Sequence, residues 1–334
     1  MKIKSIITNS ILLFLFSCTN TASKETNLKM ETDNYISYYK KCNEALESKV
    51  NGDITKAIQL YELAFSEHYP FVDDLNELKN CYVLLGKKSE AYLIIERMVL
   101  CGFKLKEKSY LISPNSAIVG KKNLQLESDS NLIDQLNLNY VSLRKEFLSS
   151  INYEKDKYLT TIASLDRFTG YMRTHSGEKD EAYIATVGFN ALAQLFLNLM
   201  DSDQLPYRYE SDAWDDQINL ALIHIALSLE KHEEQERFLN KLKELVICGT
   251  FPPAQYAVIF DQIYERVRNN KESFYGMSFE AVFNFDDPSQ LKLVITSPMD
   301  IDNVDKRRNE IFLPPLWVWA KQKGYQLPIN YSYN

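Results

Sequence analysis

The stretch that decides the fold is Asn51-Gly52-Asp53-Ile54-Thr55-Lys56-Ala57-Ile58, which returns in altered form as Leu85-Gly86-Lys87-Lys88-Ser89-Glu90-Ala91-Tyr92. Gly52 and Gly86 are 34 residues apart, and so are Ala57 and Ala91. A glycine can adopt the left-handed conformation that closes a helix. An alanine at the same place in each unit allows two helices to pack closely. The repetition therefore predicts two helical hairpins, each with its glycine at the turn.

A period of 34 residues resembles that of tetratricopeptide repeats, in which each unit is a pair of helices. Further positions fit this pattern: Ala45, Tyr61, Ala64 and Pro70 in the first unit, and Leu78 and Tyr82 in the second. We therefore expect four helices within residues 34–101, at about 34–50, 53–67, 71–85 and 87–101. Two repeats are fewer than the three or so that usually stand alone, so they should dock on the C-terminal part of the chain. The resemblance implies a protein or peptide partner for the repeats.

The remaining chain predicts a connector over 102–150, with a helix near 129–149, and then an α-rich domain over 151–334. Helical patterns in that domain cover Glu181–Met200, Asp216–Leu229, Glu233–Cys248 and Gln255–Asn269. Asp216–Leu229 is apolar nearly all round, which is typical of a helix at the centre of a domain. Two strand-like runs, Phe279–Phe285 and Leu291–Thr296, flank an Asp-Asp-Pro-Ser turn and predict a small β-hairpin. The fold class is therefore mainly α: helical-hairpin repeats followed by an α-rich domain with a small β-hairpin.

The N-terminus has the features of an export signal. Lys2 and Lys4 precede an apolar run of about eleven residues, too short for the roughly 20 that span a membrane. The run ends in Leu15-Phe16-Ser17-Cys18, which resembles the lipobox of bacterial lipoproteins. This resemblance implies that residues 1–17 are removed and that Cys18 is lipidated. An uncleaved anchor, or a plain signal with a chance cysteine, is the alternative.

The residues after Cys18 predict how the protein meets the membrane. Residues 18–33 are mostly polar, as in a flexible tether. Thr19 is not the aspartate that commonly retains such lipoproteins in the inner membrane, so the outer membrane is favoured within the cell envelope. The formal net charge of −7 disfavours nucleic-acid binding and broad adhesion to anionic lipids. The lipid on Cys18 is thus the only membrane attachment that we expect.

Four other cysteines, Cys42, Cys81, Cys101 and Cys248, lie in helical apolar patterns. Cysteine behaves there as a small buried hydrophobic residue, which favours free core thiols. Because export permits disulfides, a bridge between Cys42 and Cys81 is the alternative. The cysteines show neither CxxC nor Cys/His spacing, so we predict no metal site and no cofactor.

Scattered residues in the C-terminal domain resemble an uncharacterised bacterial family, known only as a domain of unknown function and often attached to tetratricopeptide-like repeats in exported proteins. The matching residues are Asp166-Arg167, Asn190, Gln217, His224, Tyr256-Ala257, Asp261, Phe274-Tyr275-Gly276, Val304-Asp305-Lys306-Arg307-Arg308 and Leu313-Pro314-Pro315-Leu316. The resemblance covers roughly residues 155–325. Gln262 stands where an arginine commonly follows Asp261, and Phe312 replaces a glycine. Because the family has no established activity, the resemblance informs the fold and marks Asn190 and Tyr275 as candidate binding residues.

His224 is the main candidate for chemistry. Its helical neighbours are aliphatic, so we expect it to be buried and to need a polar partner. Buried arginines likewise need carboxylates, and Arg307 and Arg308 could pair with Asp166, Asp261 or Asp305. One interpretation is a cleft in which His224 acts as a general base or contacts a ligand, a carboxylate orients it, and an arginine binds an anion. The other is a satisfied core histidine with structural ion pairs.

Three functions remain open from the sequence. The first is a membrane-anchored lipoprotein that acts as a protein- or ligand-interaction module. The second is an enzyme of unknown class with a pocket formed by Asp166, His224, Asp261 and Arg307 or Arg308. The chain lacks the GxSxG, HExxH, GxxxxGK[ST] and GxGxxG motifs of familiar hydrolases and nucleotide enzymes. The third is a scaffold, which would lack an exposed apolar surface.

Overall fold

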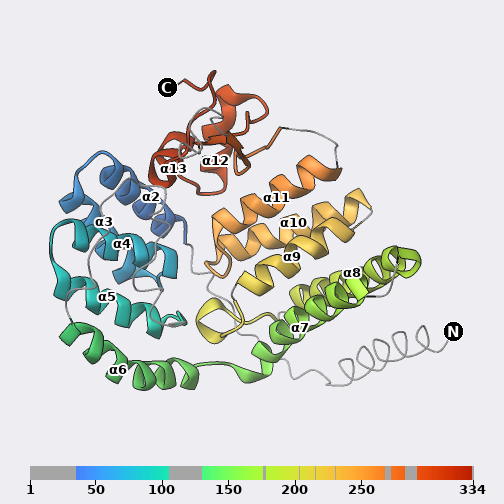
Figure 1. The fold of residues 1–334 in the computed structure, drawn as a ribbon, viewed down its shortest axis with the longest axis horizontal. Coiled ribbons are helices and arrows are strands. Elements are labelled where there is room, and N and C mark those ends of the chain that lie inside the picture. Colours follow the sequence, from blue (N-terminus) through green and yellow to red (C-terminus); the bar gives the residue numbers. More distant parts are fainter. Residues whose placement is uncertain are drawn as a thin grey trace.

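The computed structural model describes residues 35–104, 130–175, 178–202, 204–214, 216–229, 231–267, 272–282 and 292–332. The predicted signal peptide, Cys18, the tether and residues 105–129 of the connector lie outside these ranges. The predicted fold class is confirmed: helices pack against their neighbours along the chain, and a small two-stranded sheet lies near the C-terminus (Figure 1).

The repeat helices lie where the 34-residue period places them. They are α2 (Ile36–Val50), α3 (Ile54–Glu67), α4 (Val72–Leu84) and α5 (Lys88–Leu100). Gly52 and Gly86 have φ angles of 91° and 72°, which is the left-handed region that glycine tolerates. Ala57 and Ala91 are both fully buried at the start of the second helix of each hairpin. These positions confirm the two predicted hairpins.

A further helix, α6 (Ser130–Ser149), packs against α5 and extends the stack of hairpins (Figure 1). The Asn139 side chain donates a hydrogen bond from Nδ2 to Glu96 Oε1 at 2.8 Å. The helix agrees with the prediction for 129–149. No third sequence repeat is visible, so this stacking is a finding of the structure.

Five helices form the larger part of the C-terminal unit (residues 151–332). They are α7 (Tyr153–His175), α8 (Glu178–Asp201), α9 (Asp216–Ser228), α10 (His232–Ile247) and α11 (Pro253–Val267), with the short 3-10 helix η3 (Arg208–Glu210) before α9. Helices α7 and α8 approach closely at Gly188, which has no side chain. A Cβ atom at this position would lie only 2.6 Å from Cγ2 of Thr169. That close approach brings α7, α8 and α9 into mutual contact.

The end of the chain forms the predicted hairpin and two short helices. Strands β1 (Phe279–Val282) and β2 (Lys292–Ile295) are antiparallel, with Phe279 opposite Ile295. Gln326 lies on the other side of β2 and donates its N–H to Leu293 O at 2.8 Å. The remaining elements are η4 (Ile301–Asn303), α12 (Val304–Glu310) and α13 (Leu316–Lys323).

The repeats dock on the C-terminal unit, as their small number led us to expect. The ring of Tyr39 on α2 stacks on Phe312, with centroids 5.4 Å apart and 11° between the planes. Asn43 donates from Nδ2 to the Phe312 carbonyl at 2.9 Å, and the Tyr39 hydroxyl donates to Val246 O at 2.8 Å. One cluster of buried apolar residues runs from Tyr35 to Leu313. Repeats and C-terminal unit therefore share a core.

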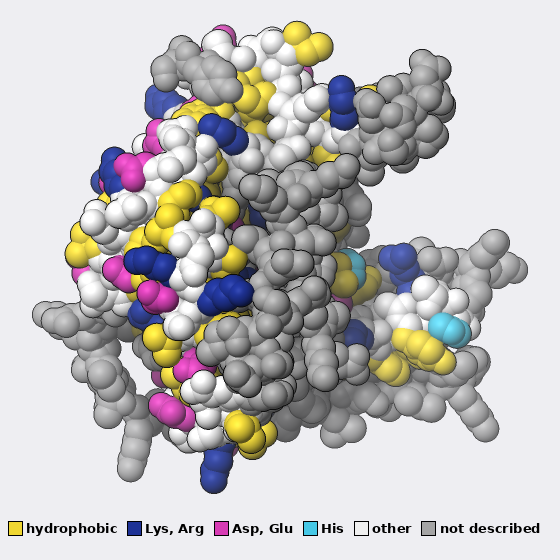
Figure 2. All heavy atoms as spheres, turned by 60° about the vertical axis from the view of Figure 1, so that its left-hand side comes forward, with side chains coloured by type: hydrophobic (Ala, Val, Ile, Leu, Met, Phe, Trp, Pro, Cys, Tyr) yellow, Lys and Arg dark blue, Asp and Glu magenta, His cyan; other side chains and the backbone are white. Residues whose placement is uncertain are grey.

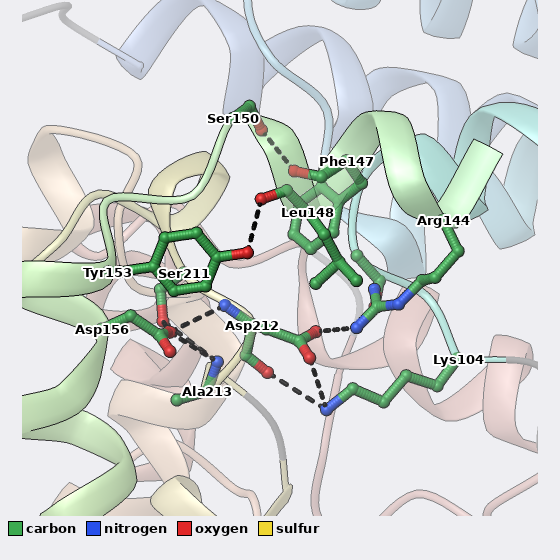
Figure 3. Close-up of polar contacts among 11 residues, drawn as sticks. Lys104, Arg144, Phe147, Leu148, Ser150, Tyr153, Asp156, Ser211, Asp212 and Ala213 are labelled. Carbon is green, nitrogen blue, oxygen red and sulfur yellow. Dashed lines mark hydrogen bonds and ion pairs between the residues drawn. The ribbon is translucent and has the colours of Figure 1, made fainter. Parts of the chain in front are cut away.

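A second set of contacts between the repeats and the C-terminal unit holds the turn at residues 211–213 between α6 and α7 (Figure 3). Asp212 forms ion pairs with Arg144 of α6 and, at 3.3 Å, with Lys104. Asp156 of α7 accepts hydrogen bonds at Oδ1 from the Ser211 hydroxyl and from the Asp212 N–H at 2.9 Å. The two carboxylates thus connect the repeat stack to the first helix of the C-terminal unit.

The cysteine prediction can be checked at four positions. Cys42, Cys81 and Cys101 are buried free thiols, and Cys248 is a half-buried free thiol. The alternative bridge between Cys42 and Cys81 is not formed.

Candidate functional site

Asp166 and His224 meet between α7 and α9. The Nδ1 atom of His224 lies 2.8 Å from Oδ1 of Asp166, whose residue is 4% exposed. The Phe189 ring on α8 packs against the imidazole, with centroids 5.1 Å apart. The His224 side chain is 35% exposed, so the expectation of a buried histidine was wrong. The reason is that one side of α9 faces solvent, where Leu220 is 50% exposed.

This pair has the geometry of an oriented base. A buried carboxylate bonded to Nδ1 fixes the ring and leaves Nε2 as the nitrogen available to another group. In the part of the chain that the structure describes, no arginine or carboxylate other than Asp166 contacts His224 by a hydrogen bond or ion pair. The side chain of Gln217 lies outside that part. The pair could move a proton, but the described residues do not complete a catalytic set around it.

Asp261 on α11 has a different role. Its carboxylate is 1% exposed and accepts the N–H groups of Phe274, Tyr275 and Met277 at 2.8, 2.9 and 2.9 Å. Burial raises the pKa of Asp261 to about 6, against the lowering effect of the three hydrogen bonds. Asp261 therefore braces the turn at residues 274–277.

Arg308 on α12 holds the same turn from the other side. It is fully buried and donates from Nε to Pro314 O and from Nη1 to Tyr275 O, both at 2.7 Å. Burial lowers the pKa of this guanidinium to about 10. Among the described residues, backbone carbonyls and not carboxylates accept the hydrogen bonds of Arg308, and its Nη2 has no hydrogen-bond partner. The charges of Asp305 and Asp261, two of the predicted partners, still oppose the lowering of its pKa.

Arg307 braces the turn in a similar way. It donates from Nε to Phe274 O at 3.0 Å, and its guanidinium lies 4.7 Å from the centroid of the Phe274 ring. Its ion pair is with Asp300 at 3.6 Å, and not with a predicted aspartate. The third candidate, Asp305, accepts the Leu316 N–H and the Tyr331 hydroxyl, each at 2.6 Å.

Of the two candidate binding residues, only Tyr275 differs from expectation. Tyr275 is 6% exposed, and its ring packs against Phe260 with centroids 5.0 Å apart. It belongs to the core, so its ring is not open to a ligand. Asn190 is half-buried on α8, next to the Phe189 that contacts His224.

The five catalytic candidates form two groups. Asp166 and His224 join α7 to α9, while Asp261, Arg307 and Arg308 secure the 274–277 turn between α11 and α12. Among the described contacts, no hydrogen bond or ion pair links the groups. Three of the residues that carry the family resemblance, Asp261, Arg307 and Arg308, thus brace the turn that contains Phe274, Tyr275 and Gly276. Asp156 and Asp212 are not among the predicted site residues, because no motif around them distinguishes them in the sequence.

Comparisons with known proteins do not assign this chain to a family. Protein-family models, curated proteins and solved structures were compared with this chain, and none of them matches it significantly. Within the described ranges, no helix is both long and apolar enough to cross a membrane. The same ranges contain no cluster of three or more histidine, cysteine, aspartate or glutamate residues suited to a metal ion.

Proposed function

We propose that this chain is a lipid-anchored lipoprotein of the cell envelope, favoured at the outer membrane, that binds a protein or peptide partner through its helical surface. The observation that carries the proposal is the solvent side of α9. Leu220 is 50% exposed there, and Ile223 and Leu227 are half-buried. An exposed apolar residue followed by half-buried apolar residues on the next turns of a helix is typical of a surface that contacts another protein. Helix α9 packs against α7, α8 and α11, and its remaining side, with Leu220 and His224, is open to solvent.

The lipid anchor is tested by Cys18→Ser. We expect the variant to move from the membrane fraction to the soluble fraction, because the acidic body has no other expected membrane contact. Basic and acidic side chains are interspersed on the repeat face shown in Figure 2, which is not a surface of one charge. Cys248→Ser is the matched control and should stay with the membrane. A Cys18→Ser protein that still pellets after a high-salt wash would contradict the anchor.

Partner binding is tested by photo-crosslinking in intact cells. A photoreactive amino acid at Leu220 should give discrete crosslinked bands, because α9 is the proposed contact surface. The same amino acid at Lys306, an exposed position on α12, is the control. Identical patterns at both positions, or none at Leu220, would count against this surface.

An enzyme is the second candidate, and the Asp166–His224 pair is the observation that favours it. A buried aspartate that orients a half-exposed imidazole is the base-and-orienter part of many hydrolytic sites. Purified protein should then hydrolyse a member of a panel of chromogenic esters, phosphoesters and glycosides. His224→Gln should abolish that activity, whereas His232→Gln should retain it. No hydrolysis by the wild type, or full activity in His224→Gln, would reject this candidate.

A further inference from the structure

Helices α10 and α11 enclose a surface cavity that no function considered so far uses. Its volume is about 300 Å³, at the small end of the range for ligand pockets. Leu239 on α10 and Phe260 and Ile263 on α11 supply apolar lining, and the rings of Tyr256 and Tyr264 border it. A cavity of this size with an apolar floor fits one large side chain of a partner.

The α10 side of the cavity is polar. His232, Glu236 and Asn240 line it and follow one another at intervals of four residues, so they share one face of the helix. His232 Nε2 lies 3.1 Å from Glu236 Oε1, and both side chains are more than 60% exposed. Polar groups at the edge of an apolar floor match the anatomy of a protein-binding hot spot.

The described lining of this cavity carries one carboxylate, Glu236, which pairs with His232, and it includes no lysine and no arginine. Glu233 and Glu234 add acidic side chains in the first turn of the same helix, and Lys231 pairs with Glu234. A cationic segment therefore complements this rim better than an acidic one.

The aromatic lining forms a row along α11. The Phe260 ring lies between Tyr256, with centroids 6.1 Å apart and 44° between the planes, and Tyr264, with centroids 6.3 Å apart and 16° between the planes. The apolar floor is thus suited to an apolar side chain, with the positive charges placed outside at the rim.

We propose that this cavity binds a short basic peptide segment of a protein partner, which inserts one aliphatic or aromatic side chain between α10 and α11. Lysine or arginine residues beside that side chain pair with Glu236 and Glu233. The proposal rests on the proposed function as an interaction module, and it names the chemistry of the partner and a contact surface other than α9.

A random peptide library displayed on phage tests the proposal against the purified, detergent-solubilised full chain. Selected peptides should contain one large apolar residue beside two or more basic residues. Synthetic fluorescent copies should bind the Asn240→Trp variant, whose cavity is filled, at least tenfold more weakly. Glu236→Lys should have the same effect. Glu244→Lys makes the same charge change on α10 outside the cavity lining, and it should alter binding less than twofold.

Several outcomes would overturn the proposal. These are no enrichment of any peptide, an acidic consensus, or equal loss of binding in Glu236→Lys and Glu244→Lys, which would indicate unspecific charge attraction. Thermal melts of the variants must match the wild type, which confirms that they fold. If Leu220 crosslinks in cells while no peptide selects the cavity, only this inference fails. If Leu220 gives no crosslinks, the proposed α9 surface fails independently.

Discussion

At Asp261 two opposing effects act on one carboxyl group. Burial disfavours the charged form, and three backbone N–H groups favour it. Burial is the larger, since the pKa of Asp261 is raised to about 6 from an ordinary value of about 3.9. A folded-state pKa above the unfolded one means that the native state holds the proton more tightly. This contribution to stability is therefore fully present below about pH 4 and is lost as the pH rises to about 6.

Asp261→Asn removes this titration. We expect the wild type to lose about 3 kcal/mol of unfolding free energy relative to the variant between pH 4 and pH 7, from a shift of about two pKa units. Urea unfolding at several pH values measures the difference. Asp302→Asn, on the exposed η4, is the control and should follow the wild type. Parallel pH profiles for wild type and Asp261→Asn would show that the carboxyl does not titrate in this range.

His224→Ala should be less damaging than a core truncation, because the ring is partly exposed. We expect a loss of about 1–3 kcal/mol, mainly from leaving the buried Asp166 carboxylate without its partner. Phe238→Ala, at a fully buried ring, should lose about 3–5 kcal/mol. Urea denaturation compares the two. Equal losses would mean that His224 is a structural core residue and nothing more.

The candidate residues could be chosen from the sequence, but their partners could not. Asp166 and His224 are 58 residues apart, and only the crossing of α7 and α9 brings them together. A carboxylate is the expected hydrogen-bond partner of Arg308 because a buried charge needs compensation, yet backbone carbonyls of Pro314 and Tyr275 accept its hydrogen bonds. Asp305 and Asp261 favour its charged form through their charge alone. Turn geometry of this kind depends on the tertiary fold, so residue types and spacing do not reveal it.

At the scale of elements, the 274–277 turn depends on Gly276. Its φ angle is 72°, and a Cβ atom there would lie 3.0 Å from Leu316 Cδ1 and 3.3 Å from Pro298 Cγ. Gly86 has the same φ angle but no atom within 4 Å of its Cβ position. A side chain at either glycine would strain the backbone equally, because the φ angles are the same. Only at Gly276 would it also collide with neighbouring atoms.

Gly276→Ala should therefore destabilise the protein more than Gly86→Ala. Both variants lose about 1–2 kcal/mol to left-handed backbone strain, and Gly276→Ala loses roughly 1–3 kcal/mol more to overpacking. Urea denaturation of both variants measures the difference. Equal unfolding free energies would indicate that Leu316 and Pro298 move aside without cost.

Prediction of elements succeeds where a period is long and fails where it is short or interrupted. The 34-residue spacing places four repeat helices within two residues of their observed ends. Helix α7 is not predicted as one element, because Thr160, Thr161 and Ser164 are weak helix formers and Gly170 lies near its end. Helices α12 and α13 have 7 and 8 residues, too few for a periodic pattern.

For the whole molecule, the shared core predicts cooperative unfolding. The tryptophans of the protein all belong to the C-terminal unit: Trp214, Trp317 and Trp319. The buried thiols belong to the repeats: Cys42 and Cys81 lie on repeat helices, and Cys101 directly follows α5. The two kinds of probe therefore report on different halves. Because the core cluster is continuous from Tyr35 to Leu313, neither half can unfold without exposing apolar surface of the other.

Tryptophan fluorescence and thiol labelling should accordingly change at the same urea concentration, measured in a Cys248→Ser background so that labelling reports on the repeats. Phe312→Ala removes the ring that stacks on Tyr39 and should weaken the joint between the halves. In that variant the thiols should become reactive at a lower urea concentration than the one at which fluorescence changes. Phe279→Ala, at a half-exposed ring on β1, should keep the two transitions together. Separate transitions already in the Cys248→Ser protein would show that the repeats fold independently of the C-terminal unit.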